Sequence, residues 1–201
     1  LESGPTAGVM SAAQLARDLD LPHVIAFDMG GTTAKAAVIK HGEPAFTPEL
    51  EVGAGMSSSS RLTRGAGYLL RTPSIDLVEI GAGGGSIASV DEAGGISVGP
   101  TSAGADPGPA CYGLGGRNAT LTDATVVLGH INPSSQLGSS MTLDASAAER
   151  VVEKNIARPL GTSLIEAADA VHRIAAAELA RAMRAVPSER GINPEMFTLI
   201  A

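Results

Sequence analysis

The segment from residue 23 to residue 40 constrains the fold most, because its pattern predicts a strand, a turn and a second strand. Residues 24–27 are β-branched or apolar, as in a buried strand, and a second such run follows at 36–39. The turn between them carries a carboxylate, two glycines and two hydroxyls: Asp28, Gly30, Gly31, Thr32 and Thr33. A carboxylate can orient a hydrated cation, and glycine amides can come close to phosphate oxygens.

This turn matches neither of two common nucleotide loops. No Gly-Lys-Ser/Thr follows it, which excludes a Walker loop, and it lacks the third glycine of the dinucleotide fingerprint. It resembles the second phosphate loop of actin-like ATPases, sugar kinases and heat-shock chaperone ATPases, in which a β-hairpin holds the β- and γ-phosphates. A glycine-rich hairpin turn with a chance aspartate is the alternative.

Composition limits the partners. A chain of 201 residues can bury one core, and its net charge of −7 disfavours nucleic acid and anionic membrane surfaces as partners. Its single cysteine, Cys111, fits a reducing compartment, and no apolar run approaches the roughly eighteen residues of a membrane span. We therefore expect a cytoplasmic protein. The four histidines fit no metal-ligand spacing.

The remaining pattern predicts strands followed by helices. A helix of about four turns should begin at Ser3, and a third strand, at the edge of the sheet, should cover residues 45–52. Residues 53–67 are typical of a flexible surface loop, and Ile87 should begin a hairpin. In that hairpin, residues 87–90 should pair with 96–98. The C-terminal part, 122–190, should be helical, and a last strand should follow it. The expected helices are 122–128, 143–160 and 163–186, and the expected strand is 196–200.

Two loops are candidates for function. Gly83, Gly84 and Gly85 precede Ser86, so their backbone can approach a nucleotide; a tight crossing against the core is the alternative. The segment 99–116 has no helical or strand periodicity, and long ordered loops usually have a function. Its cysteine, Cys111, could be a nucleophile, but a packed thiol is the more common role of such a residue.

The segment 98–116, followed by Thr-Leu-Thr-Asp-Ala at 120–124, closely resembles the signature of the hydantoinase A/oxoprolinase family. The resemblance begins at Ser-Gly-Pro 3–5, includes 28–32 and 81–88, and ends at Glu-Arg-Gly 189–191. It implies an α/β fold, one lobe of an actin-like, ribonuclease H-like ATPase with a mixed sheet and flanking helices. It also implies that residues 1–201 form one hydantoinase A-type domain, a fragment of a larger subunit.

The resemblance implies ATP-dependent hydrolysis of a cyclic amide such as a hydantoin, oxoproline or another lactam. ATP and Mg²⁺ would be the cofactors, with Asp28 at the metal and Gly30 to Thr33 and Gly83 to Ser86 at the nucleotide. Asp28, Asp106 and Asp123 are the candidate catalytic residues, and Cys111 and Tyr112 are further candidates near the substrate or a metal. A second, hydantoinase B-type subunit or domain is the expected partner. Family members carry a further Asp-Gly-Gly-Thr loop and a glycine-rich adenosine-binding turn that these residues lack, so we expect the fragment alone to be inactive.

Two other functions stay open, namely an ATP-dependent ketone carboxylase subunit and a non-catalytic nucleotide-binding lobe of the same fold. One residue departs from the family pattern. Many relatives have an aspartate where this chain has Lys35, so Lys35 is a candidate for phosphate contact.

Overall fold

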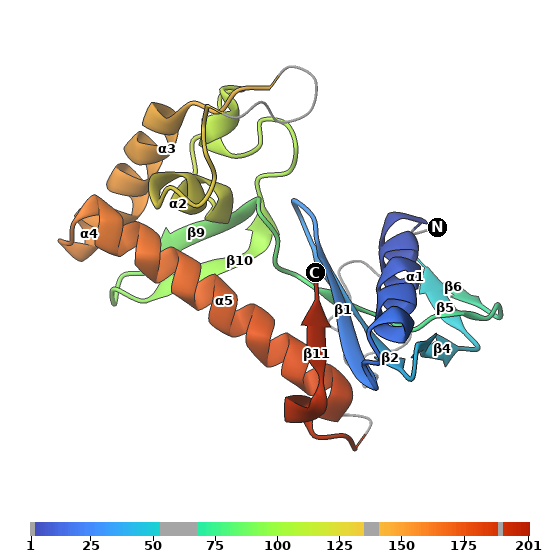
Figure 1. The fold of residues 1–201 in the computed structure, drawn as a ribbon. Helices are drawn as coiled ribbons and strands as arrows, with labels where there is room; N and C mark the ends of the chain where they lie inside the picture. Colours follow the sequence, from blue (N-terminus) through green and yellow to red (C-terminus); the bar gives the residue numbers. More distant parts are fainter. Residues whose placement is uncertain (1–2, 53–67, 135–140, 189–190) are drawn as a thin grey trace. The chain divides into compact units, whose positions relative to one another are not determined.

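The structure, a computed structural model, describes residues 3–52, 68–134, 141–188 and 191–201. The predicted flexible loop 53–67 lies outside these residues. The chain divides into two compact units (Figure 1). One comprises Leu1–Met29, Thr33–Gly81 and Ala180–Ala201, and the other comprises Gly30–Thr32 and Ala82–Leu179. Where composition predicts one core, the buried apolar residues form separate clusters in the two units.

A mixed five-stranded sheet forms the centre of the first unit, which confirms the predicted α/β class. β11 pairs in parallel with β1, and β1 pairs with β2 in an antiparallel hairpin from His23↔Lys40 to Met29↔Ala34. Both β3 and β8 pair with β2 in antiparallel register. The strands are β1 (His23–Met29), β2 (Ala34–Lys40), β3 (Glu43–Pro44), β8 (Leu77–Ile80) and β11 (Thr198–Ile200).

The predicted N-terminal helix is α1 (Ser3–Asp18), and it packs on this sheet. Its buried side chains are small: Val9, Ala12, Ala13 and Ala16. They form one cluster with residues of β1 and β2, among them Val24 and Ile39. Alanines at helical spacing let the helix axis come close to the strands, so this unit buries a compact aliphatic core with no large aromatic residue among the buried members.

The prediction of one edge strand over residues 45–52 is wrong. Short strands replace it, and two of them pair outside the main sheet: β4 (Phe46–Thr47) with β7 (Ser74–Ile75), and β5 (Leu50–Val52) with β6 (Tyr68–Leu70). Pro48 lies between β4 and β5, and a proline has no N–H to donate to a ladder, which is consistent with the break between these two strands.

The second unit contains the predicted hairpin and most of the helical part. β9 (Ser86–Val90) pairs with β10 (Ile96–Ser102), which continues into the segment where no strand was expected. The helical elements are η2 (Ala110–Tyr112), α2 (Leu121–Val127), α3 (Ala145–Val152), the π-helical η3 (Glu153–Ala157), α4 (Arg158–Leu160) and α5 (Leu164–Ser188). A short η4 (Pro194–Met196) precedes β11.

The helical prediction is therefore confirmed in outline, since α3, η3 and α4 together cover most of the predicted helix 143–160. Their buried residues join those of β9, β10 and α5 in the largest cluster of this unit, which includes Ala88, Val98, Ile156 and Val171. The boundary between the two units falls within α5. Within the described segments, no helix combines the length and apolar character needed to cross a membrane.

Replacing Ile156 by alanine should destabilise the second unit. Ile156 is fully buried in the cluster, so Ile156→Ala should lower the free energy of unfolding by about 2–5 kcal/mol. Ile165→Ala is the control, because Ile165 is 56% exposed on α5 and should cost well under about 1 kcal/mol. Urea unfolding measures both. Equal losses in the two variants would contradict the packing described for η3.

Candidate functional site

The predicted phosphate loop is the turn between β1 and β2. Asp28, near the end of β1, is exposed, and so are Gly30, Gly31 and Thr32, whereas Thr33 is half-buried. A Cβ placed on Gly31 would meet no atom within 4 Å, so the backbone is accessible at this residue. An exposed carboxylate followed by accessible glycine backbone is the residue set that a hydrated cation and a phosphate group require.

The Gly83 to Ser86 segment packs closely against this turn. The amides of Gly84 and Gly85 donate to the carbonyls of Gly30 and Gly31 at 3.0 and 2.6 Å. The Gly83 amide donates to Ser86 Oγ at 2.9 Å, and the Ser86 amide donates to the Gly83 carbonyl at 3.0 Å. All four amides of the segment thus have acceptors within the protein.

Steric contacts explain why these positions are glycines. A Cβ on Gly83 would lie 2.7 Å from the Gly30 carbonyl oxygen, and a Cβ on Gly85 would lie 2.9 Å from that of Gly31. A Cβ on Gly84 would lie 2.8 Å from Thr122 Oγ1, which donates to the Gly84 carbonyl. This geometry is the tight crossing that the sequence left open as an alternative. A direct role of Gly83 to Ser86 in nucleotide binding stays a prediction.

Asp123 lies at the start of α2, where it is fully buried. Its carboxylate accepts hydrogen bonds from the amides of Ala110, Cys111 and Thr120, and from the Thr120 hydroxyl, at 2.7–3.2 Å. Thr120 is the N-cap of α2, so the helix begins one residue before the predicted start at 122, and the Thr120 hydroxyl accepts from the Asp123 amide. Four donors satisfy this buried carboxylate and join η2 to α2.

Asp106 differs from Asp123 in its access to solvent. Asp106 is exposed in the segment between β10 and η2, whereas Asp123 has no exposed surface. The Asp106 side chain is therefore open to solvent, whereas the Asp123 carboxylate is enclosed and already accepts four hydrogen bonds. The geometry therefore supports a structural role for Asp123, and the catalytic roles of both residues stay predictions.

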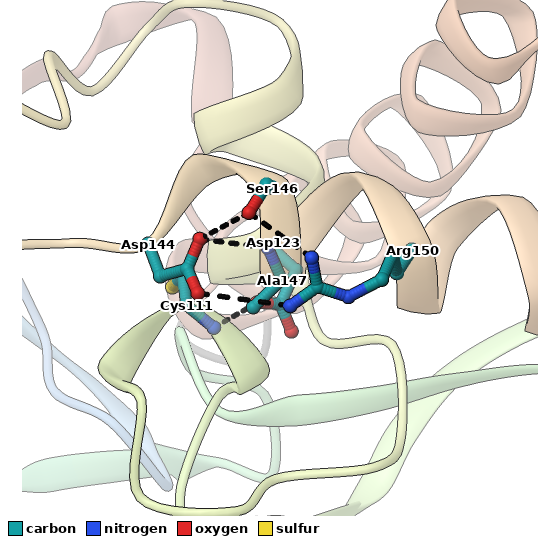
Figure 2. A network of polar contacts seen from close by, with 6 residues as sticks. All are labelled: Cys111, Asp123, Asp144, Ser146, Ala147 and Arg150. Carbon is teal, nitrogen blue, oxygen red and sulfur yellow. Dashed lines mark hydrogen bonds and ion pairs between the residues drawn. The ribbon is translucent and has the colours of Figure 1, made fainter.

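Cys111 connects Asp123 to the start of α3, as Figure 2 shows. Its amide donates to Asp123, and its carbonyl accepts from the amide of Asp144, the N-cap of α3. Asp144 in turn accepts from the Ser146 hydroxyl and the Ala147 amide, and it faces the Arg150 guanidinium at 3.7 Å. The pKa of Asp144 lies below its usual value, and the hydrogen bond from the Ser146 hydroxyl is the main cause.

The Cys111 thiol is packed and protonated. Its side chain is fully buried beside Val126, Leu143 and Ala148. Burial is the main cause that raises the pKa of the thiol far above its usual value, and the negative charge of Asp123 raises it further. Since the thiolate is the nucleophile, these surroundings favour the packed thiol over the catalytic one.

A pocket of about 310 Å³ lies in the first unit, between α1 and the sheet. Asp28 and Lys35 line it together with mostly apolar residues, among them Leu15 and Phe27. Lys35 pairs in register with Asp28 on β1 and with Glu79 on β8. Directly paired residues of neighbouring strands point to the same face of a sheet, so the three charged residues form a row across it.

Glu79 is the residue of this row that sequence reasoning missed. Its Oε1 lies 3.9 Å from Lys35 Nζ, and the Lys35 side chain is only 14% exposed. Nothing in the local sequence distinguishes Glu79 from other acidic residues at strand positions. Only the pairing of β8 with β2 brings it to Lys35, and that pairing joins residues about forty positions apart.

The available ligands fit magnesium better than a metal held by protein alone. Among the described residues, no three histidine, cysteine, aspartate or glutamate side chains form a group that could hold a metal ion. Mg²⁺ keeps several waters and is commonly bound by one or two carboxylates together with phosphate oxygens. One exposed carboxylate, that of Asp28, is compatible with this mode of binding.

The chain matches known proteins over its whole length. Residues 1–201 match the family described as hydantoinase/oxoprolinase. The chain is 45% identical over 199 residues to an uncharacterised protein of Methanocaldococcus jannaschii, covering 99% of this chain and 29% of that protein. It is 38% identical over 202 residues to the acetophenone carboxylase gamma subunit of Aromatoleum aromaticum, covering 98% of this chain and 26% of that subunit.

A solved structure shows the same fold. The ATP-dependent caprolactamase from Pseudomonas jessenii matches with a TM-score of 0.77 and 36% sequence identity, covering 99% of this chain and 27% of that one. The matches confirm the resemblance found in the sequence. The chain spans less than a third of the length of each of these relatives.

Removing the Asp123 carboxylate should destabilise the chain. Asp123→Ala would leave three buried amides and one hydroxyl without their acceptor, so the free energy of unfolding should fall by about 3 kcal/mol or more. Asp169→Ala is the control, since the Asp169 carboxylate is 52% exposed and pairs with Arg173 on the helix surface. Urea denaturation compares the two, and an Asp123→Ala variant as stable as the control would contradict the assigned structural role.

The single thiol should be unreactive in the folded chain. At pH 8, a disulfide reagent such as DTNB should label Cys111 only as urea unfolds the protein, because the native thiol is buried and protonated. Above about pH 8.5 the thiol loses its proton in the unfolded chain, whereas the buried native thiol keeps it. The unfolded state then binds fewer protons than the native state, so the free energy of unfolding should fall as the pH rises past that value. Cys111→Ala should remove this alkaline loss. Rapid labelling in native buffer would show an accessible thiolate.

Proposed function

Because the chain belongs to the hydantoinase/oxoprolinase family, we propose that it forms part of the nucleotide-binding region of an ATP-dependent enzyme that hydrolyses a cyclic amide. The substrate would be a hydantoin, oxoproline or another lactam. The observation that carries the proposal is the match, over 99% of the chain, to the ATP-dependent caprolactamase. The exposed turn at Asp28 to Thr32 supports it, because its residue types suit a metal and a phosphate group.

In this proposal each part of the turn has one task. Asp28 would orient Mg²⁺ through coordinated water, and the backbone and hydroxyl groups of Gly30 to Thr33 would hold phosphate oxygens. The crossing of Gly83 to Ser86 would keep the turn in a fixed conformation, because its amides bind the carbonyls of Gly30 and Gly31. ATP, when bound, would supply the phosphoryl group that makes the amide carbon easier for water to attack. The protein's contribution is then mostly positioning and charge neutralisation.

The chain would act as one part of a larger assembly. Its relatives are more than three times its length, and the relative from Aromatoleum aromaticum is named as a subunit. We propose that the region is one lobe of an actin-like ATPase within a longer subunit, with a hydantoinase B-type subunit or domain as its partner. The single cysteine favours a reducing, cytoplasmic location.

A ketone carboxylase subunit is the second candidate. The observation in its favour is the 38% identity to the acetophenone carboxylase gamma subunit, close to the 36% identity to the caprolactamase. Both activities would use the same turn for the nucleotide. Assays of the complete gene product with its partner would separate them, because lactam hydrolysis needs only water and ATP, whereas carboxylation also needs bicarbonate and a ketone.

The turn can be tested with two substitutions that should leave the fold intact. In the complete gene product, Asp28→Ala and Gly31→Ala should each weaken binding of ATP with Mg²⁺ by roughly tenfold or more. Gly4→Ala is the matched control for Gly31→Ala, because a Cβ meets no atom within 4 Å at either glycine. Isothermal titration measures affinity, and thermal unfolding checks the fold. Unchanged ATP affinity in Asp28→Ala would contradict the proposal.

A further inference from the structure

The row Asp28, Lys35 and Glu79 places one cation between two carboxylates. Lys35 is directly opposite Asp28 in the β1–β2 pair and directly opposite Glu79 in the β2–β8 pair. Residues directly opposite each other on neighbouring strands are close enough for their charges to interact. The ammonium can therefore pair with either carboxylate, and its position decides which of them keeps its negative charge unscreened.

The structure favours the Glu79 side. Lys35 Nζ lies 3.9 Å from Glu79 Oε1, and both side chains are partly withdrawn from water, with exposures of 14% and 34%. Asp28 is exposed and lines the pocket together with Lys35. A partly buried ion pair is screened less by water and salt than an exposed one, so Glu79 can restrain the ammonium.

We propose that Glu79 is a positioning residue that holds Lys35 away from full pairing with Asp28. The Asp28 carboxylate then stays available for a divalent cation, while the Lys35 ammonium stays at the wall of the pocket, where it can pair with an anionic oxygen of a phosphate group. This inference rests on the proposed function, because it assigns to two further residues a role in the same nucleotide site. It also gives a reason for a lysine at this position, because the lysine would supply positive charge that an aspartate could not.

The decisive experiment separates metal affinity from nucleotide affinity in the complete gene product. Two titrations are measured, Mg²⁺ into protein saturated with ATP, and ATP into protein in EDTA. Glu79→Gln should weaken Mg²⁺ binding by roughly fivefold or more, because loss of the Glu79 charge shifts the ammonium toward Asp28, and it should change ATP binding in EDTA by less than about twofold. Lys35→Met should instead weaken ATP binding in EDTA by about fivefold.

The double variant Lys35→Met/Glu79→Gln tests the coupling directly. Without the ammonium there is nothing for Glu79 to hold, so the loss of Mg²⁺ affinity caused by Glu79→Gln should disappear in the Lys35→Met background. Glu49→Gln is the matched control, because Glu49 is 31% exposed and lies 3.8 Å from Arg71 Nε in an ion pair of the same unit. It should leave both affinities unchanged.

The outcomes distinguish the two proposals. If the wild type binds ATP with Mg²⁺ in a manner that depends on Asp28, but Glu79→Gln behaves like Glu49→Gln, the positioning role is overturned and the proposed function stands. Two other results also overturn the positioning role. One is additive losses of Mg²⁺ affinity in the double variant, and the other is a Glu79→Gln variant that loses Mg²⁺ affinity and ATP affinity in EDTA to the same extent. If the wild type binds no ATP, both proposals fail together.

Discussion

Hydrogen bonds from the amides of Gly84 and Gly85 to the carbonyls of Gly30 and Gly31 fix the turn on which the rest of the site depends. A Cβ on Gly83 would collide with the same turn, so the contact requires glycine and not merely a flexible segment. A glycine-rich turn would otherwise lose much conformational entropy on binding an anion. Under the proposed function, preorganisation by this crossing would lower that cost, and a Cβ on Gly31 would still meet no atom within 4 Å.

The sequence predicts the local elements well because their signals are local. The continuous apolar runs at residues 24–27 and 36–39 lead to the β1–β2 hairpin, and the alanine spacing of residues 9–16 leads to α1. It fails where pairing is distant. β4 pairs with β7 although residues 48–73 separate them in sequence, and β5 likewise pairs with the distant β6. These strands of two or three residues carry too few side chains to show a period.

The site could be predicted only in part, for the same physical reason. The Asp-Met-Gly-Gly-Thr-Thr segment indicates its chemistry from residue types and order alone, so Asp28 and Gly31 could be proposed from the sequence. Glu79 could not, because its meaning comes from its register with Lys35 across β2 and β8. The burial of Asp123 was also hidden. Thr120 and Asp123 form a capping box, and only the packing of η2 on α2 supplies the further donors that enclose the carboxylate.

Access to water divides the acidic residues of this chain into those that can hold a cation and those that cannot. The Asp123 carboxylate has four donors and no exposed surface, so its charge is already compensated within the protein. The Glu79 carboxylate is partly compensated by Lys35. Asp28 is exposed and lines a largely apolar pocket, where no hydrogen-bond donor among the described residues contacts its carboxylate. Residue type alone would make the three equivalent; their donors and exposure make Asp28 the strongest candidate ligand for a divalent cation.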